Sequence, residues 1–374
     1  MILVHNLTGG GAERVASLWA TGFCDRGYDV GIVFDCRHDT PITYPIPDQV
    51  KRYNVYGNRV TGWVANKFLR IFHVDLYYVI KLRHIFRDYK PDVVIGVIQP
   101  WAEWARKAAK GMNIKIVNTE HNAFERPSDA LYNPMTRQLY REKYEQNRLY
   151  DHVTVLTEAD RRCVDGVLDN VSVLPNPLTY KPVTEVPAKE NVILAAGRLE
   201  AWHAKGLDVL IKAWGLVADR YPDWTLQIAG DVKGNGYITL ERIAADAGVG
   251  DRIEFTGYQS DMLPVYQRSA IFVMASRYEG FGMVLIEAMS QGCACVACDY
   301  KGRQKEIITT DDEGLICSPD DAQSLAHAIS MLIDDRDYRK RVQINGIERA
   351  IHYELDRIMD LWDDVLKKVC YESA

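Results

Sequence analysis

Apolar residues in this chain form short runs that are separated by longer amphipathic stretches. Runs typical of buried parallel strands lie at residues 2–5, 30–34, 92–97, 114–119 and 171–174 in the first half, and at 192–196, 226–231, 253–258, 271–275 and 293–298 in the second. Between the runs, apolar residues recur at helical spacing, as Val15, Leu18 and Phe23 do after the first run. This alternation predicts an α/β fold built on doubly wound parallel sheets.

The alternation is interrupted once and then starts again. Pro175, Pro177, Pro182 and Pro187 break the chain between the two series of strands. A chain of 374 residues is too long for one ordinary domain and suits two domains of similar size. We therefore predict an N-terminal domain at residues 1–178, a C-terminal domain at 188–354 and an amphipathic helix at 355–374.

Composition limits the class of protein. A formal net charge of -6 argues against extensive nucleic-acid binding. No apolar run approaches the length of a membrane span, and the first residues lack the basic-then-apolar pattern of a secretion signal. The eight cysteines show no pairing pattern, so we expect a cytosolic protein. Cys293, Cys295 and Cys298 are interpreted as small apolar residues of a packed strand rather than as zinc ligands.

The most informative stretch follows the apolar run at 271–275. It reads Ser-Arg-Tyr-Glu-Gly-Phe-Gly from Ser276 to Gly282, and a helix is predicted to begin near Met283. The glycines leave backbone N–H groups uncovered, and a helix N-terminus adds partial positive charge, so this turn is a candidate anion site. Glu279 precedes that site and Glu287 lies behind it. This order suits a ligand with a polyhydroxyl group, a diphosphate and a ribose; the alternative is a loop glutamate plus an ordinary solvated helix glutamate.

Three other predicted strand ends carry candidate residues. Contiguous glycines, including Gly10 and Gly11, follow the first strand, but their spacing fits neither a dinucleotide fingerprint nor a P-loop. His121 follows the strand at 114–119, where ligands of open α/β sheets lie, although a histidine there is often only structural. Arg198 and Lys205 follow the strand at 192–196, and two cations at one site would stabilise a departing diphosphate.

Three charged segments leave alternatives open. Basic and aromatic residues interleave at 59–90, which suits either an anionic membrane surface or a helical pair packed on the sheet. Arg137, Arg141, Lys143 and Arg148 follow on a predicted helix at 134–150. Arg137, Arg141 and Arg148 share one face of it, and this basic stripe fits either an acceptor phosphate or a solvated face. The Asp335-Arg336-Asp337 string lies between two predicted helices, far from any strand end. We interpret it as solvated charge, and we expect neither a required metal nor a cofactor.

Several of these strings, in order along nearly the whole chain, resemble those of glycosyltransferase family 4. The similar strings are Gly-Gly-Ala-Glu-Arg at 10–14, Glu-His at 120–121, Pro-Asn-Pro at 175–177, Gly-Arg-Leu at 197–199 with Lys-Gly at 205–206, and Glu-Gly-Phe-Gly with a second glutamate at 279–287. The gap between Arg198 and Lys205 is longer than the family's, because Trp202 and His203 are inserted. The resemblance implies the GT-B architecture: two Rossmann-like domains facing a central cleft, with the terminal helix crossing back to the first.

The resemblance also implies an activity and residue roles. The activity is transfer of a hexose or N-acetylhexosamine from a nucleotide diphosphate sugar, UDP-linked by family frequency, to a glycan or lipid-linked glycan, with anomeric retention. Such enzymes assemble bacterial lipid-linked oligosaccharides or capsular polysaccharides in the cytoplasm, in peripheral contact with the membrane. Implied catalytic residues are Glu279, His121, Arg198 and Lys205. Implied donor-binding residues are these cations and Glu279 together with Gly10, Gly11, Gly230, Tyr258, Phe281, Gly282, Met283, Val284 and Glu287. Implied acceptor-binding residues are Arg137 and Arg141.

Two other functions fit the same frame. One is a sugar-nucleotide epimerase or hydrolase, which would act on the donor without an acceptor. The other is a catalytically silent nucleotide-sugar-binding subunit that supports a partner. The presence together of Arg198, Lys205, Glu279 and Glu287 argues against the silent subunit.

Overall fold

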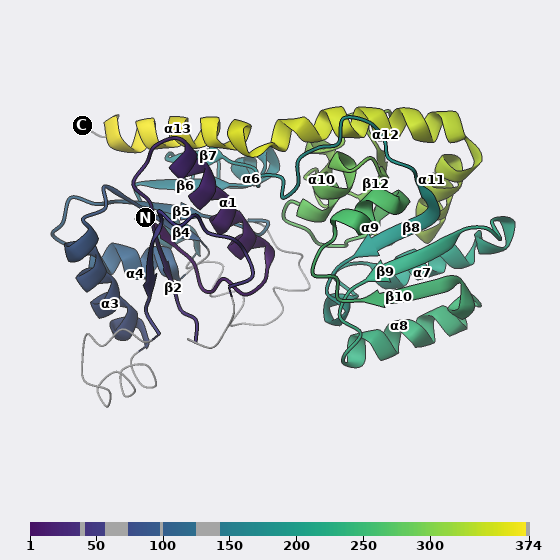
Figure 1. Cartoon of the computed structure of the whole chain (residues 1–374), viewed down its shortest axis with the longest axis horizontal. Helices are drawn as coiled ribbons and strands as arrows, with labels where there is room; N and C mark the ends of the chain where they lie inside the picture. Colours follow the sequence, from purple (N-terminus) through teal and green to yellow (C-terminus); the bar gives the residue numbers. More distant parts are fainter. Residues whose placement is uncertain (38–41, 57–73, 98–99, 125–142, 372–374) are drawn as a thin grey trace. The chain divides into compact units, whose positions relative to one another are not determined.

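The structure is a computed structural model that describes residues 1–37, 42–56, 74–97, 100–124 and 143–371. The chain divides into two compact units, Met1–Pro177 with Leu355–Ala374, and Leu178–Glu354. Each unit contains a parallel sheet and helices that pack on it (Figure 1). The α/β fold with two parallel sheets that the apolar pattern predicts is therefore confirmed.

The sheet of the first unit has the strand order β3-β2-β1-β4-β5-β6-β7, and neighbouring strands run parallel. Its strands are β1 (Ile2–Leu3), β2 (Gly31–Phe34), β3 (Lys51–Asn54), β4 (Val93–Val97), β5 (Lys115–Thr119), β6 (His152–Val155) and β7 (Val171–Val173). Its helices are α1 (Gly11–Asp25), α3 (Val74–Tyr89), α4 (Trp101–Ala108), α6 (Glu158–Cys163) and α13 (Leu355–Tyr371). The strand order reverses between β1 and β4, which places this sheet's topological switch point there.

Helices α3 and α4 cover one face of this sheet with an aromatic cluster. Tyr78 stacks on Trp104 with ring centroids 4.0 Å apart, and Trp101 packs edge-on to both. Tyr77, Tyr78 and Lys81 are buried, so these members of the basic-aromatic segment pack inside the first unit. A membrane-facing interpretation is wrong for these residues. The residues before 74 lie outside the described part of the chain.

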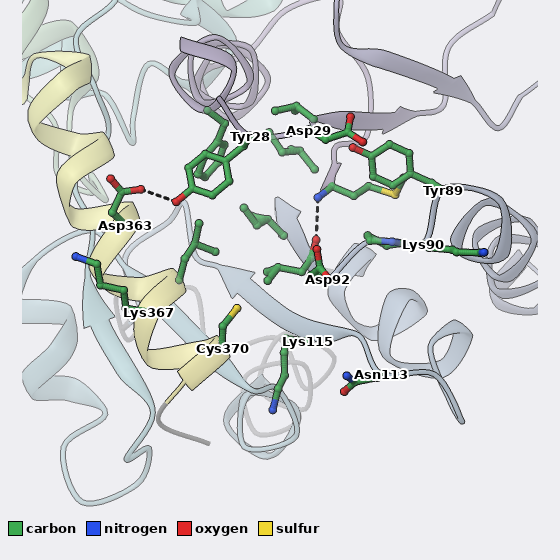
Figure 2. A pocket seen from close by; sticks show the side chains of 18 residues that line it. Tyr28, Asp29, Tyr89, Lys90, Asp92, Asn113, Lys115, Asp363, Lys367 and Cys370 are labelled. Atoms are coloured by element: carbon green, nitrogen blue, oxygen red, sulfur yellow. Dashed lines mark hydrogen bonds between the residues drawn. The ribbon is translucent and has the colours of Figure 1, made fainter. Parts of the chain in front are cut away.

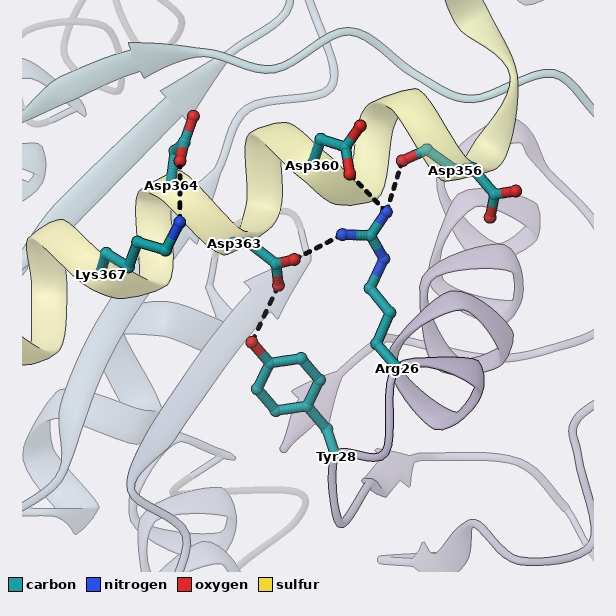
Figure 3. Close-up of polar contacts among 7 residues, drawn as sticks. All are labelled: Arg26, Tyr28, Asp356, Asp360, Asp363, Asp364 and Lys367. Carbon is teal, nitrogen blue, oxygen red and sulfur yellow. Dashed lines mark hydrogen bonds and ion pairs between the residues drawn. The ribbon is translucent and has the colours of Figure 1, made fainter.

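Helix α13 packs against α1 in the first unit (Figure 1). Trp362 is fully buried and packs edge-on to Trp19, with ring centroids 4.9 Å apart. At the other end of α1, Arg26 donates to Asp360 Oδ1 at 2.6 Å, to the Asp356 carbonyl at 2.7 Å and to the Asp363 carboxylate (Figure 3). An apolar stripe and an arginine clamp thus fix the last helix to the first unit, as predicted.

The sheet of the second unit has the strand order β10-β9-β8-β11-β12-β13, and its neighbouring strands also run parallel. Its strands are β8 (Glu190–Ala196), β9 (Thr225–Ala229), β10 (Ile253–Gly257), β11 (Ser269–Met274), β12 (Ala294–Cys298) and β13 (Leu315–Cys317). Its α-helices are α7 (Leu207–Gly215), α8 (Asn235–Asp246), α9 (Leu263–Arg268), α10 (Met283–Ser290), α11 (Ala322–Asp334) and α12 (Arg336–Ala350). The strand order reverses between β8 and β11.

Two further predictions from the sequence are tested in this unit. Strand β12 is buried throughout, and burial raises the pKa of the Cys295 thiol well above its usual value and that of Cys298 to about 12. These cysteines are packed strand residues, as predicted. Asp335 caps helix α12 by accepting a hydrogen bond from the Tyr338 N–H at 2.8 Å, so this member of the Asp335–Asp337 string has a structural role.

Candidate active site

The candidate site of the second unit lies at the carboxyl ends of β8 and β11, the two strands that flank the switch point. In open parallel sheets, ligands bind in the crevice outside this edge. Arg198 and Lys205 follow β8, and Glu279 follows β11. The two segments touch directly, because the N–H of Arg277 donates to the Ala204 carbonyl at 2.9 Å.

Lys205 and Glu279 form an ion pair at this edge. Lys205 Nζ lies 2.5 Å from Glu279 Oε2, and the two side chains are 25% and 18% exposed. The methylene groups of Lys205 extend alongside Gly197, the residue before Arg198. Arg198 is exposed, and we find no hydrogen bond or ion pair of its side chain within the described part of the chain. The structure thus brings Lys205 and Glu279 together, alongside the backbone of Gly197, and the next residue is the exposed Arg198.

Arg277 fixes the two segments to each other, which the sequence did not predict. Its guanidinium donates to Asp208 through two bonds of 2.6 and 2.8 Å and to the His203 carbonyl at 2.7 Å, and it also pairs with Asp320. Burial alone would raise the pKa of Asp208, but the hydrogen bonds and charge of Arg277 outweigh it and lower that pKa. The available signal was an arginine in the turn after β11 and an aspartate in the first turn of α7, the helix after β8.

Two glycines allow these turns. Gly206 has φ 62°, and a Cβ there would lie 1.9 Å from the Ala275 carbonyl oxygen. Gly282 has φ 95° and precedes α10, and a Cβ there would lie 2.9 Å from Met274 Sδ. Both residues occupy the left-handed region, so a side chain at either position would push the turn away from β11.

The first turn of α10 presents backbone donors. N–H groups in the first turn of a helix, here those of Met283 and Val284, have no acceptor inside the helix, and the helix dipole adds positive charge. The Phe281 side chain is buried, and its carbonyl accepts a bond of 3.4 Å from the Gln304 side chain. This hydrogen bond helps to fix the peptide group between Phe281 and Gly282.

Glu287 lies one turn into the same helix and is only 2% exposed. Its two carboxylate oxygens accept hydrogen bonds from the Thr179 hydroxyl at 2.6 Å and the Tyr266 hydroxyl at 3.0 Å. Burial, followed by the charge of Glu287, raises the pKa of Tyr266 well above its usual value, so Tyr266 remains a donor. The interpretation of Glu287 as an ordinary solvated helix residue is therefore wrong.

Gly230 and Tyr258 extend the same edge. Gly230 follows β9, and its backbone packs against the Gly197 carbonyl, where a Cβ would lie only 2.3 Å away. Its N–H donates to the Gly257 carbonyl at 3.1 Å, which places the end of β10 beside it. Tyr258 comes next and is 69% exposed. Strands β9 and β8 separate it from β11 in the sheet.

In the first unit, the glycine turn lies at its own switch point, after β1. Gly10 is the N-cap of α1, and Gly11 is the first residue of that helix. The Glu13 carboxylate reaches back over Gly10, where a Cβ would lie 2.2 Å from Oε2. A carboxylate of the chain itself therefore covers this helix start, and burial raises its pKa.

His121 lies at the carboxyl end of β5, as predicted, and is half-buried. Its Nε2 lies 3.0 Å from the Thr119 hydroxyl, and its ring packs 5.4 Å from the Trp19 ring. Burial lowers the pKa of His121 to about 4, against smaller opposing effects of Glu120 and Asn176. The ring is neutral at pH 7, so it cannot serve there as a cation for a phosphate.

The predicted acceptor residues Arg137 and Arg141 lie outside the described residues. Two other basic residues of the predicted helix contact the protein. Lys143 pairs with Glu120 at 2.8 Å and is only 11% exposed. Arg148, the third member of the basic stripe, is exposed and donates to the Val167 carbonyl at 3.2 Å.

A cavity of about 780 Å³ lies elsewhere in the first unit, between the amino ends of its strands and α13 (Figure 2). Aspartates, lysines and tyrosines surround an apolar floor there. The predicted site residues are not among those that line it. Within the described residues, we find no helix with the length and apolar composition needed to cross a bilayer.

Family models match both halves of the chain. Residues 9–179 match the model described as "Glycosyltransferase Family 4", and residues 178–349 match "Glycosyl transferases group 1". The chain belongs to the family 4 glycosyltransferases. The family that the motifs resemble is thereby confirmed.

Two similar proteins match nearly the whole chain. An uncharacterized glycosyltransferase of Haemophilus influenzae is 25% identical, with 96% of each chain covered. A Campylobacter jejuni protein is 24% identical, with 98% of each chain covered; its name is GalNAc-alpha-(1->4)-GalNAc-alpha-(1->3)-diNAcBac-PP-undecaprenol alpha-1,4-N-acetyl-D-galactosaminyltransferase.

Solved structures show the same fold. A sucrose-phosphate synthase from Thermosynechococcus elongatus superimposes with a TM-score of 0.80 at 19% identity, covering 100% of this chain and 99% of the other. Anabaena HepE, solved in complex with UDP and glucose, superimposes with a TM-score of 0.77 at 18% identity and 98% coverage of both chains. This family 4 glycosyltransferase thus has the GT-B fold.

Proposed function

We propose that this glycosyltransferase transfers a hexose or N-acetylhexosamine from a UDP-linked donor to a hydroxyl of a glycan or lipid-linked glycan, with retention of anomeric configuration. The observation that carries the proposal is the Lys205–Glu279 pair of 2.5 Å beside the exposed Arg198, at the switch point of the second sheet. Two cations at one strand edge suit a diphosphate, and an adjacent carboxylate suits sugar hydroxyls.

In the proposed reaction, the bond between the sugar's anomeric carbon and the diphosphate breaks. Its electron pair goes to the phosphate oxygen, where Arg198 and Lys205 stabilise the growing charge. The acceptor hydroxyl forms the new bond on the same face of the sugar, and its proton goes to the departing phosphate. Glu279 would exchange its bond with Lys205 for bonds to the sugar, which leaves Lys205 available to the phosphate.

The remaining donor contacts come from helix α10 and the strand ends. The N–H groups from Phe281 to Val284 bind the phosphate and the sugar in the proposal. We assign the ribose hydroxyls to Glu287, whose carboxylate is held in place by the Thr179 and Tyr266 hydroxyls. We further assign Gly230 and Tyr258 to the nucleobase, Gly10 and Gly11 to the donor, and neutral His121 to the sugar.

The choice of donor and acceptor is supported by similar proteins. The Campylobacter jejuni relative is named for transfer of N-acetylgalactosamine to an undecaprenyl-diphosphate-linked glycan. The Anabaena neighbour was solved with UDP and glucose. We extend the nucleotide and the lipid-linked acceptor from these proteins to this chain, with Arg137 and Arg141 as the proposed contacts of the acceptor.

A lipid-linked acceptor places the enzyme at the cytoplasmic face of a membrane in this proposal. Val74 and Leu76, at the start of α3, are 46% and 48% exposed and directly follow the basic-aromatic residues at 59–73. Replacing Lys67 and Arg70 with serine should weaken co-sedimentation with anionic vesicles. Unchanged sedimentation would remove the membrane contact from the proposal and leave the reaction unaffected.

The function is tested in two steps. A thermal-shift panel of UDP-, GDP- and ADP-sugars identifies the donor, because only a bound ligand stabilises the folded state. UDP release is then measured with and without a glycan acceptor. Acceptor-dependent release with an α-linked product from an α-linked donor supports retaining transfer. Equal release without acceptor indicates a hydrolase, a changed donor without release indicates an epimerase, and donor binding without turnover indicates the silent subunit.

A further inference from the structure

The turn after β12 reaches the candidate site from a third strand end. Asp299, the first residue after that strand, accepts hydrogen bonds from the backbone N–H groups of Gly302 at 2.8 Å and Gln304 at 3.0 Å. A single carboxylate thus closes a compact turn, as aspartates often do. The Tyr300 ring of this turn packs edge-on to Tyr278, with ring centroids 5.0 Å apart. The turn after β12 therefore lies beside the segment that follows β11.

Gln304 is fully buried in this turn, and both polar atoms of its side-chain amide have partners. Its Oε1 accepts a hydrogen bond of 2.7 Å from the Tyr300 N–H. A backbone N–H can only donate, so this contact identifies the amide oxygen and assigns the other position to the NH₂ group. The NH₂ group donates to the Phe281 carbonyl in a long bond of 3.4 Å. Gln304 thus connects the turn after β12 to the turn that precedes α10.

The contact with Phe281 sets the direction of the next backbone donor. In a trans peptide group, the C=O and the N–H point in opposite directions. Because the Phe281 carbonyl points toward Gln304, the Gly282 N–H points away from it. Within the described residues, we find no acceptor for this N–H. It therefore adds to the N–H groups of Met283 and Val284, which have no acceptor inside α10.

Gln304 opposes the alternative orientation of this peptide group. Glycine adopts positive and negative φ with similar ease, so the peptide before Gly282 can rotate more readily than one before a residue with a Cβ. Rotation by half a turn would direct the Phe281 carbonyl oxygen, rather than the Gly282 N–H, toward a bound phosphate. It would also leave the buried NH₂ group of Gln304 without its acceptor, which is unfavourable.

We propose that Gln304 is a positioning residue of the transferase: it orients the Phe281–Gly282 peptide so that the Gly282 N–H donates to the sugar-bearing phosphate of the donor. Gln304 itself contacts neither donor nor acceptor. The contact with phosphate rests on the proposed function, whereas the orientation of the peptide does not.

Gln304→Met tests the proposal, with Gln343→Met as the matched control. Methionine has a similar length to glutamine but neither donates nor accepts through an amide. Gln343 is also buried in the second unit, and its NH₂ group donates at 3.1 Å to the carbonyl of Ala270, near the amino end of β11. Each variant loses a buried amide, so we expect both to lower the urea midpoint. Only Gln304→Met alters the turn at the carboxyl end of β11.

Calorimetry measures the consequence for ligand binding. Gln304→Met should bind UDP about tenfold more weakly than the wild type does and should bind UMP, which lacks the second phosphate, nearly as well. Gln343→Met should bind both as the wild type does. Gln304→Glu keeps an acceptor for the Tyr300 N–H, but its carboxylate cannot donate to Phe281, so it should show the same loss for UDP at pH 8. Wild-type affinity for UDP in either Gln304 variant, or an equal loss in Gln343→Met, would overturn the proposal.

Hydrogen exchange tests the orientation of the peptide without a ligand. The Leu285 N–H donates to the Gly282 carbonyl at 2.9 Å, so its protection reports on this turn. We expect it to exchange faster in Gln304→Met than in the wild type or in Gln343→Met. Equal protection in Gln304→Met and the wild type would overturn the positioning role. Failure of the wild type to bind UDP would contradict the proposed function and leave the exchange result unaffected.

Discussion

Lys205 Nζ lies 2.5 Å from Glu279 Oε2, although 74 residues separate them along the chain. The pair joins the segment after β8 to the segment after β11 across the switch point. Since both side chains are partly exposed, the pair adds little to stability and is open to exchange with a ligand. The role proposed for the pair is chemical, because it places a cation beside a carboxylate that can accept hydrogen bonds from sugar hydroxyls.

Lys205→Met should therefore separate activity from stability. We expect UDP release in the presence of donor and acceptor to fall about 100-fold or more, because a donor to the developing charge is lost. The free energy of unfolding should change by less than about 1 kcal/mol. Lys212→Met, at an exposed position of α7, is the matched control and should keep full turnover. Wild-type turnover in Lys205→Met would remove Lys205 from the site.

Replacement of Arg277, in contrast to that of Lys205, should lower the stability of the fold. Arg277→Met leaves Asp208 buried without its bidentate partner, and we expect a loss of about 2–4 kcal/mol in urea unfolding. Arg277→Lys should recover only part of this loss, because an ammonium cannot reproduce the planar fork. Arg341→Met breaks the exposed pair with Asp312, in which the side chains are 56% and 55% exposed, and should cost less than about 1 kcal/mol. Similar losses of unfolding free energy in Arg277→Met and Arg341→Met would show that the buried Arg277–Asp208 contact stabilises the fold no more than an exposed ion pair does.

His152 should make stability depend on acid pH. Burial, with a smaller effect of Lys368, lowers its pKa to about 4, and Nε2 lies 2.9 Å from the Ser172 hydroxyl. Below about pH 6.5 the unfolded chain binds a proton that the folded chain does not, so the free energy of unfolding falls as pH falls, by about 3 kcal/mol by pH 4. Urea unfolding of His152→Gln between pH 7 and 4 should show a shallower dependence. His352→Gln, at an exposed position, should show the same pH dependence of unfolding free energy as the wild type. If His152→Gln showed that same dependence, His152 would not be the source of the acid-dependent loss.

Arg26 should control how firmly α13 is held. Arg26→Met removes the bonds to Asp360 and Asp363 and to the Asp356 carbonyl (Figure 3), and we expect a loss of about 1–2 kcal/mol with faster proteolysis of residues 355–371. Lys367→Met breaks an exposed pair of 3.4 Å with Asp364 and should have no measurable effect. Unchanged proteolysis of Arg26→Met would show that the apolar stripe alone holds the helix.

The sequence predicted those features that depend on local pattern. Apolar runs located the strands because strands of a parallel sheet are buried on both faces. The segment from Ser276 to Glu287 was found because the glycine turn and the two glutamates are close together in the chain. The strand ends then placed Arg198 and His121 at the correct edges of their sheets.

The sequence did not predict contacts between residues that lie far apart along the chain. Thr179 lies 108 residues from Glu287, so nothing local indicates that this glutamate is buried and bonded on both oxygens. The same holds for Arg277 and Asp208, which are 69 residues apart. In α3, basic and aromatic residues interleave whether they face lipid or a sheet, and only packing shows that Lys81 is buried.

The binding of the diphosphate by Arg198 and Lys205 can be measured by calorimetry of UDP and UMP on the wild type and Arg198→Gln. If Arg198 and Lys205 bind the diphosphate, the variant should bind UDP at least about tenfold more weakly and UMP nearly as well as the wild type does. An Arg198→Gln variant that binds UDP as tightly as the wild type would contradict the claim.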